Sequence, residues 1–302
     1  MGARVRESRY LFSGGRVYCA VVAKLKTAGL GVVGFLGVGC APALSSFTPA
    51  HVAPKHHVQA EVGFDVSVPT GSISDIVDEA PALARAAHDH ELTEDEQRRL
   101  FRAGGALALN PPSLVSHVGV AYTPLEHFEV NGRLVSGAWR LGARYQVLQQ
   151  ALQSVDGSVS LGGGHYSYEF PLSDQVPLVR LEDFSRWQLD AAFLVGRHGD
   201  WYRVWGGPRL LFSFYGTELV FDQPSIPGVT GDKLVLASLD GTATYLGGQV
   251  GGALGYKHVF IGFELTMVKF WTSASLKLLQ NKHDLDLQSF IVYPGLALML
   301  EL

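Results

Sequence analysis

The sequence predicts an all-β protein: an antiparallel up-and-down transmembrane β-barrel of about ten strands, within a range of about eight to twelve, with a short helix in the first long loop. Three observations predict it. Glycine contributes 35 of the 302 residues, and charged residues only 17%, against ~25% in soluble domains. Apolar and polar residues alternate along repeated stretches, which indicates strands with one apolar face. Short and long connections alternate between these strands, as in outer-membrane barrels.

Residues 1–43 are predicted to be a leader and signal peptide. An uncharged run at residues 27–39 follows two lysines; it is too short for a transmembrane helix and is typical of a secretory signal. Two cleavage sites compete. Cleavage before Cys40 is favoured by a lipobox-like sequence and would leave Cys40 as a lipidated N-terminus, whereas cleavage after Ala43 uses a site of the small-x-small type. The leader predicts export, and lipidation at Cys40 is the favoured interpretation.

Residues 44–56 are predicted to form a periplasmic tether, and residues 57–302 the barrel. The tether is rich in Ser, Pro and His and has no periodicity, which is typical of a linker. Its histidines, His51, His56 and His57, are interpreted as solvated side chains rather than metal ligands. We expect no metal site and no cofactor, because both cysteines precede the barrel.

Ten strands are predicted from the alternation. The first covers residues 57–68 and alternates without interruption, which exceeds the ~5–6 residues of a soluble strand and matches the ~9–11 that cross a bilayer. An even number of strands places both termini on one side of a closed barrel. The other strands are expected at residues 114–123, 127–136, 138–148, 158–168, 187–197, 201–214, 243–257, 259–271 and 287–301.

The connections sort by length if the first strand runs outward from the periplasm. Short periplasmic turns are expected at residues 123–126, 148–157, 198–200 and 257–258. Outer connections, four of the five long, are expected at residues 69–113, 137, 169–186, 215–242 and 272–286. A helix is predicted within the first outer loop, because a capping box begins at Thr93 and Gly104 can end it; residues 72–87 are weakly helical.

The five tryptophans are predicted to lie in interfacial girdles. Each falls near the end of a predicted strand, where aromatic side chains meet the membrane–water interface. A soluble sandwich would instead place them in mid-strand. The residues are Trp139, Trp187, Trp201, Trp205 and Trp271.

The hairpin at residues 118–130 and the last strand, at residues 293–302, resemble the hairpins and the C-terminal insertion signal of small outer-membrane β-barrel proteins of Gram-negative bacteria. Leu296 and Leu298 alternate outward, and Leu302 stands where that family usually has an aromatic residue. The resemblance implies location in the bacterial outer membrane, contact with its lipids and insertion by the barrel-assembly machinery. We expect a monomer that binds no nucleic acid, since the net charge is −4 without a basic block.

Ten charged residues share the inward-facing parity of their strands, and they comprise five acids and five arginines. An arginine facing lipid in mid-membrane would cost ~2–4 kcal/mol, whereas acids and arginines facing one another inside can pair. A sealed, ion-paired core is favoured over a selective polar channel or a ligand-coordinating interior. The predicted lumen network consists of Glu61, Asp65, Glu129, Arg133, Arg140, Arg144, Asp190, Arg203, Arg209 and Glu264.

The predicted function is that of a porin-like cell-envelope barrel without catalytic activity, either structural or passing or binding a small ligand. One alternative is a hydrolase of lipid or lipopolysaccharide. Its candidate pair, His165 and Ser167, shares a strand face but has no acid or oxyanion donor assigned to it. The second alternative is a soluble, lipocalin-like periplasmic binding barrel, which requires an apolar interior and a polar exterior.

Overall fold

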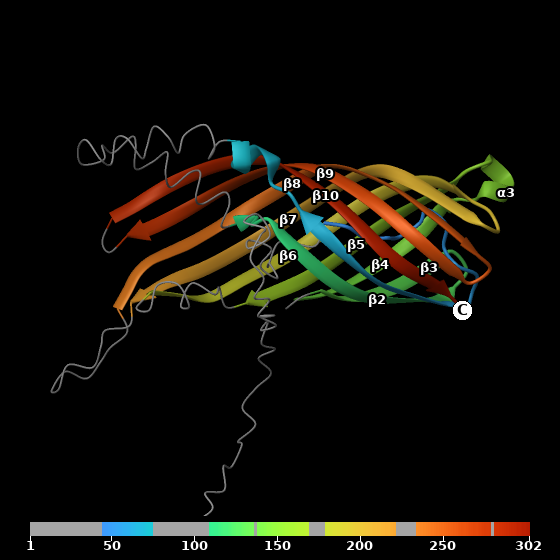
Figure 1. The fold of residues 1–302 in the computed structure, drawn as a ribbon, viewed down its shortest axis with the longest axis horizontal. Coiled ribbons are helices and arrows are strands. Elements are labelled where there is room, and N and C mark those ends of the chain that lie inside the picture. Colours follow the sequence, from blue (N-terminus) through green and yellow to red (C-terminus); the bar gives the residue numbers. More distant parts are fainter. Residues whose placement is uncertain (1–43, 75–108, 136–137, 169–178, 222–233, 279–280) are drawn as a thin grey trace, which may run out of the picture.

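A computed structural model shows a closed barrel of antiparallel strands, and the predicted fold class and strand number are confirmed (Figure 1). The structure describes residues 44–74, 109–135, 138–168, 179–221, 234–278 and 281–302. Each strand pairs with its neighbours in the chain, and the first pairs with the last. The strands are β1 (Val58–Ser67), β2 (Ser113–Leu125), β3 (Phe128–Val135), β4 (Ala138–Leu148), β5 (Asp156–Tyr168), β6 (Val179–His198), β7 (Tyr202–Phe221), β8 (Leu234–Tyr256), β9 (Val259–Leu278) and β10 (Asn281–Glu301).

The end of the barrel that carries the C-terminus also carries the short turns (Figure 1). Val58 at the start of β1 exchanges two main-chain hydrogen bonds with Leu302, of 2.9 and 2.8 Å, which closes the ring. Two-residue turns join β2 to β3 and β8 to β9, and each contains a residue with positive φ, His127 at 65° and Lys257 at 56°. The short helix α3 (Gln150–Gln153) lies in the β4–β5 connection. All four short connections are therefore found where the sequence predicted them, and the periplasmic location of this end stays a prediction.

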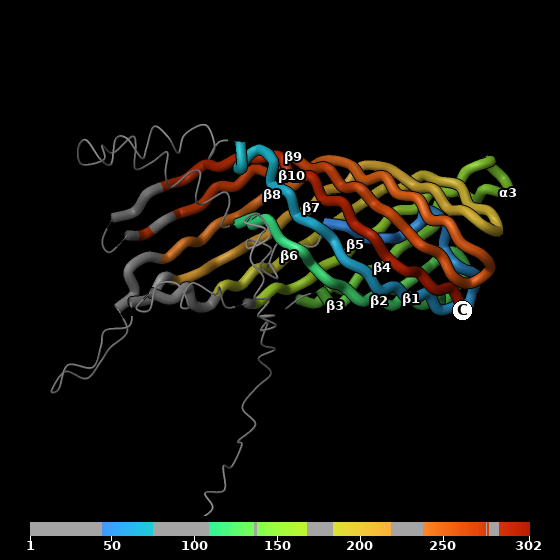
Figure 2. Tube along the Cα trace, in the orientation of Figure 1, coloured from blue at the N-terminus to red at the C-terminus, as the bar shows by residue number. Residues whose placement is uncertain are grey.

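The opposite end differs from the prediction, because β6 to β10 are much longer than expected. They contain 20 to 23 residues, against 8 to 13 in β1 to β5. Most of the residues assigned to loops at 169–186, 215–242 and 272–286 are strand, and β9 and β10 run to within two residues of each other. The barrel wall therefore extends farther outward on the β6–β10 side (Figure 2).

The strand extensions alternate with the opposite polarity to the strands below them. In β10, Leu285 and Leu287 are buried on the inner face, while Asp286 and Gln288 are exposed on the outer face. Farther down the same strand, Leu296 and Leu298 face outward and are each 40% exposed. This change is explained if the outer face of the extensions contacts water and the outer face below them contacts lipid. Only the lower part of the barrel then needs an apolar exterior.

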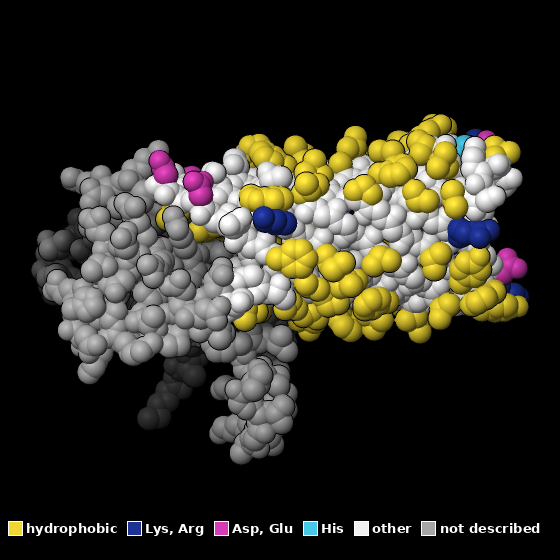
Figure 3. All heavy atoms as spheres, turned by 90° about the horizontal axis from the view of Figure 1, so that it is seen from above, with side chains coloured by type: hydrophobic (Ala, Val, Ile, Leu, Met, Phe, Trp, Pro, Cys, Tyr) yellow, Lys and Arg dark blue, Asp and Glu magenta, His cyan; other side chains and the backbone are white. Residues whose placement is uncertain are grey.

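The lower part of the barrel has an apolar outer belt, which Figure 3 shows as a broad band of hydrophobic side chains. In β10 this belt runs from Phe290 to Leu302, a length that covers ~30 Å along the normal of a membrane for a strand tilted by ~40°. Its members include Val62, Val118, Leu134, Leu141, Leu161, Leu189, Val250, Leu254, Ile261 and Phe263, all at least half exposed. A soluble barrel with a polar exterior is excluded by this surface.

The lumen is divided into two regions. Buried charged and polar side chains fill the half that carries the short turns, named here the periplasmic half after the predicted orientation. The outer half holds an apolar cluster in which Tyr245, Phe270, Ile291 and Tyr293 are fully buried. Leu109, from the end of the first outer loop, packs into the same cluster.

Only part of the first outer loop lies within the described residues. A helical turn follows β1 at residues 70–74, so a helix is present in this loop as predicted. The helix predicted to begin at Thr93, the leader with Cys40 and the turn at residue 137 lie outside the described residues. In the part of the chain that is described, no helix is long and apolar enough to cross a membrane.

Candidate functional site

The segment before β1 lies inside the barrel, which corrects the prediction of a solvated tether. Leu44, Phe47 and Ala50 are at most 2% exposed, and burial continues to residue 53. Only residues 54–56 are exposed. This plug segment, defined here as residues 44–53, starts in the apolar cluster of the outer half and descends toward the periplasmic end (Figure 2). Its lack of periodicity reflects contacts on all sides rather than exposure to solvent.

Lumen carboxylates and amides hold the plug by its main-chain N–H groups. The N–H groups of Ser46 and Phe47 donate to the two carboxylate oxygens of Glu264, at 2.6 and 3.0 Å. Lower in the lumen, the N–H of Val52 donates to Oε1 of Gln146 at 2.9 Å. These groups satisfy a buried backbone that forms no sheet or helix, as a buried backbone requires.

Lumen arginines bind the plug from the acceptor side. Arg133 Nη1 donates to the main-chain oxygen of Ser45, and Arg144 Nη1 donates to that of Pro49. The hydroxyl of Ser45 donates to Asp65 at 2.5 Å. Since Glu264 and Gln146 bind the N–H groups and arginines the carbonyls, the lumen recognises the main chain of the plug.

All ten residues of the predicted charge network have side chains inside the barrel. Arg133 Nε lies 2.8 Å from Glu61, and Arg144 pairs with Glu129. Arg203 pairs with Glu301, which the sequence analysis did not include although it shares the inward parity of β10. The remaining members, Asp65, Arg140, Asp190, Arg209 and Glu264, are at most 7% exposed.

Asp190 joins two arginines from different strands. Arg140 Nε donates to its Oδ2 at 2.6 Å, and a second nitrogen of Arg140 pairs with Oδ1. Arg209 Nη2 lies 3.9 Å from Asp190 Oδ1, and Arg209 Nη1 donates to Gln249 at 2.8 Å. One carboxylate therefore compensates two buried cations.

Trp205 corrects the girdle prediction. Its ring is 2% exposed and faces the lumen, where Nε1 donates to Glu264 at 3.0 Å. A Cβ on Gly251 of the neighbouring strand would come within 2.2 Å of the Trp205 ring, so this glycine makes room for the indole. The other four tryptophans are on the outer wall and 38–61% exposed, and their place in interfacial girdles stays a prediction.

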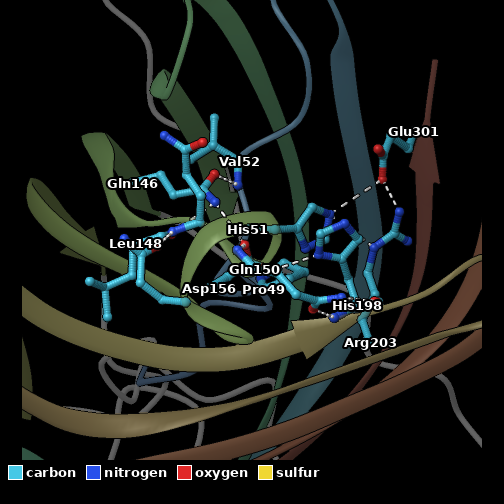
Figure 4. Close-up of polar contacts among 12 residues, drawn as sticks. Pro49, His51, Val52, Gln146, Leu148, Gln150, Asp156, His198, Arg203 and Glu301 are labelled. Atoms are coloured by element: carbon cyan, nitrogen blue, oxygen red, sulfur yellow. Dashed lines mark hydrogen bonds and ion pairs between the residues drawn. The ribbon is translucent and has the colours of Figure 1, made fainter.

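Two histidines lie at the periplasmic end of the plug, where they form the latch shown in Figure 4. The rings of His51 and His198 stack with centroids 4.5 Å apart. His198 Nδ1 lies 2.6 Å from Asp156 Oδ2. His51 Nε2 accepts a hydrogen bond from Arg203 Nε at 3.1 Å and lies 3.8 Å from Glu301. The latch thus joins the plug to four strands, β5, β6, β7 and β10.

His51 lies in the plug, outside the membrane-spanning strands, and its burial lowers the pKa of its imidazole to about 4. Arg203 and His198 also lower this pKa, whereas Glu301 raises it. The unfolded chain therefore takes up a proton near pH 6.5 that folded His51 excludes until about pH 4. Its contribution to stability is fully present above pH 6.5 and is lost as the pH falls toward 4. We expect the free energy of unfolding to decrease by ~3 kcal/mol over this window.

Urea unfolding in lipid vesicles at pH 7 and pH 4.5 measures this effect, and His51→Gln is expected to reduce the difference between the two pH values. His57→Gln, at a partly exposed position between the plug and β1, is the matched control. Equal pH dependence in native protein and His51→Gln would show that His51 does not carry it.

The arrangement of side chains around His165 gives little support to the alternative of a hydrolase. His165 Nε2 lies 3.1 Å from the hydroxyl of Ser185, not Ser167, beside the rings of Trp139 and Trp187. Among the described residues no acid orients His165. The described part of the chain also contains no group of three or more His, Cys, Asp and Glu side chains arranged to hold a metal ion.

No family model matches the chain, and no curated protein sequence matches it. It is similar to a solved major outer membrane protein of Thermus thermophilus, with 8% identity, a TM-score of 0.36, and coverage of 81% of this chain and 99% of that one. It is also similar to OprG of Pseudomonas aeruginosa (10%, TM-score 0.35, covering 81% and 96%). A third is Ail, the attachment invasion locus protein of Yersinia pestis (10%, TM-score 0.29, covering 82% and 99%).

Proposed function

We propose that this chain is an outer-membrane β-barrel of the cell envelope whose lumen is closed by its own N-terminal segment. It acts as a sealed structural barrel rather than as an open diffusion channel. The observation that carries the proposal is the burial of residues 44–53 among paired lumen charges. A ten-stranded barrel is only slightly wider than an eight-stranded barrel, and side chains alone just fill the interior of the latter. One additional chain segment with its side-chain partners is therefore enough to close the lumen.

The location in the outer membrane is supported by the molecule's own surface. A closed barrel leaves no unpaired sheet edge in lipid, and its exposed apolar belt needs a hydrocarbon environment. Outer-membrane lipids and the barrel-assembly machinery are accordingly the proposed partners, and a monomer is the proposed state.

We further propose export by the leader with cleavage after Ala43, in preference to lipidation at Cys40. Leu44 is 1% exposed within the apolar cluster of the outer half of the lumen. Three residues separate Cys40 from Leu44, so the two residues are four steps of the chain apart, a span of at most ~14 Å. Acyl chains on Cys40 would have to pass the barrel wall to reach lipid, whereas cleavage after Ala43 leaves Leu44 as the first residue.

Single-channel recording in planar bilayers tests the closed lumen. We expect native protein to be silent and a variant lacking residues 44–53, with the leader retained, to conduct ions. The removal leaves Glu264, Arg133 and Arg144 without their main-chain partners, so water enters and the charges line a pore. A synthetic peptide of residues 44–57, added to the variant, is expected to reduce its conductance.

Three controls accompany this recording. The heat-modifiability of unboiled protein on a gel establishes that each variant is folded, and the intact mass of native protein gives its mature N-terminus. Lys257→Ala, in the exposed β8–β9 turn, should leave the protein silent. Steady conductance of native protein, or a folded deletion variant that stays silent, would refute closure by the plug.

A further inference from the structure

The outer wall of the barrel carries a groove across β8, β9 and β10, which are neighbours in the sheet (Figure 1). Its volume is about 390 Å³, which lies within the range of ~300–1,000 Å³ typical of small-ligand sites. The groove begins directly above the apolar belt, since its lowest member on β10 is Gln288 and the belt on that strand begins at Phe290. A ligand in the groove would therefore lie at the boundary between lipid and water.

The strand register arranges the outward side chains of the groove in two rows. The row closer to the belt consists of Thr244, Trp271 and Gln288, and the outer row consists of Thr242, Ser273 and Asp286. Trp271 is 38% exposed, and the Ser273 hydroxyl donates to Asp286 Oδ1 at 2.8 Å. The groove thus combines one aromatic ring with hydroxyl, amide and carboxylate groups.

A cation lies directly beneath the groove, at the upper edge of the belt. Lys269 is exposed and faces outward two residues before Trp271, and its Nζ lies 5.1 Å from the centroid of the Trp271 ring. The register places Lys269 between Leu246 and Phe290, which are both exposed. The stem of the lysine therefore lies among apolar side chains, while its ammonium is directed toward the groove.

The chemistry of the wall changes in a fixed order from the belt outward: apolar, cationic, aromatic and then acidic. A glycolipid with a phosphate on its sugar has a matching order, because acyl chains adjoin the phosphorylated sugar ring and free hydroxyls lie beyond it. Lysine binds phosphate as a point charge, and basic side chains at a membrane surface attract anionic headgroups. The carboxylate of Asp286 accepts hydrogen bonds from hydroxyls and repels a second phosphate at that level.

We propose that this groove binds the phosphorylated sugar headgroup of an outer-leaflet glycolipid. Lys269 binds the phosphate, a sugar ring packs against Trp271, and its hydroxyls donate to Asp286. The acyl chains lie along the belt below. The inference rests on the proposed location in the outer membrane and is independent of the closed lumen, since the groove is on the outer wall; a barrel that conducts ions would refute closure and leave this site unaffected.

Native mass spectrometry of the folded, full-length protein in neutral detergent tests the site, with lipid A as the probe. Cardiolipin is the matched lipid, because it is also a multiply acylated diphosphate but has no sugar ring. We expect lipid A to bind saturably and at least ~10-fold more tightly than cardiolipin. Lys269→Met, which keeps the apolar stem, is expected to weaken lipid A binding by at least ~10-fold, and Trp271→Leu by ~5-fold.

Two variants elsewhere on the wall are the controls. Lys257→Met removes an exposed lysine whose Nζ lies 5.3 Å from the centroid of the Tyr256 ring, at the opposite end of the barrel. Trp187→Leu removes an exposed tryptophan from β6. Both should leave lipid A binding unchanged, because neither residue lies at the groove.

The proposal is overturned if cardiolipin binds as tightly as lipid A, if Lys269→Met keeps native affinity, or if Lys257→Met weakens binding equally. Should Trp271→Leu fail to give the compact band of a folded barrel, Gln288→Ala tests the same row of the groove. This variant is expected to weaken lipid A binding by ~3-fold, and unchanged binding in folded Gln288→Ala would contradict the assignment of the groove.

Discussion

Replacing Asp190 by alanine is expected to lower the free energy of unfolding by about 3–5 kcal/mol, because it leaves two buried cations without their shared carboxylate. Arg140 makes its charge-assisted contacts to Asp190 and Arg209 lies 3.9 Å from it, all inside the sealed part of the lumen. Were the lumen wet, the same substitution would cost only about 0–1 kcal/mol. Urea unfolding in lipid vesicles, followed by tryptophan fluorescence, measures the difference.

Two further variants give this experiment its controls. Asp200→Ala removes an exposed carboxylate from the β6–β7 turn, and its effect is expected to stay within about 0.5 kcal/mol. The double variant Asp190→Leu with Arg140→Met removes the main ion pair as a unit and should cost less than Asp190→Ala, because one buried cation is removed with the anion. If Asp190→Ala is no more destabilising than Asp200→Ala, the lumen is not sealed around these charges.

The inward charge network was predictable because alternation fixes which side chains of a strand share a face. Glu61, Arg144 and Glu264 could be assigned to the interior without knowing their partners. The pairings themselves depend on how adjacent strands are staggered, which alternation within one strand does not contain. Glu301 was missed for a different reason: it belongs to the inward parity of β10 but lies at the chain terminus, where the outward leucines dominated the interpretation.

The plug was not predictable from periodicity. An irregular chain that is held by side chains on every side has neither a period of two nor a period of 3.6 residues, so residues 44–53 were interpreted as a linker. Their small polar side chains, such as Ser45 and Ser46, suit solvent as well as a polar lumen. A partial signal existed in Phe47, an aromatic residue whose ring would be costly to leave in water.

The extensions of β6 to β10 were misassigned because the pattern changes polarity while keeping its period. Below Phe290 the outward positions are apolar, and above it they are Asp286 and Gln288. The pattern of apolar outward positions therefore ends at the membrane boundary, and the residues beyond it were predicted to be loops. Arg186 fell in one of these apparent loops, although it continues the inward parity of Gln188 and Asp190.

Replacing Glu264 by alanine is expected to be the other strongly destabilising change in the lumen, at about 3–5 kcal/mol. The substitution leaves three buried donors without an acceptor: the N–H groups of Ser46 and Phe47 and the indole N–H of Trp205. It also removes a negative charge that contacts the upper part of the plug. Urea unfolding gives the stability, and planar-bilayer recording should detect openings that native protein lacks.

The same substitution in the barrel without residues 44–53 distinguishes a plug contact from a contact within the wall. There the two plug donors are absent and water reaches the carboxylate, so Glu264→Ala should cost at least ~2 kcal/mol less than in the full chain. Glu264→Gln, which keeps the shape and one acceptor oxygen, should lie between native protein and Glu264→Ala in the full chain. An equal cost of Glu264→Ala in both backgrounds would mean that its role is confined to Trp205 and the strands, and that the plug is held by its other contacts.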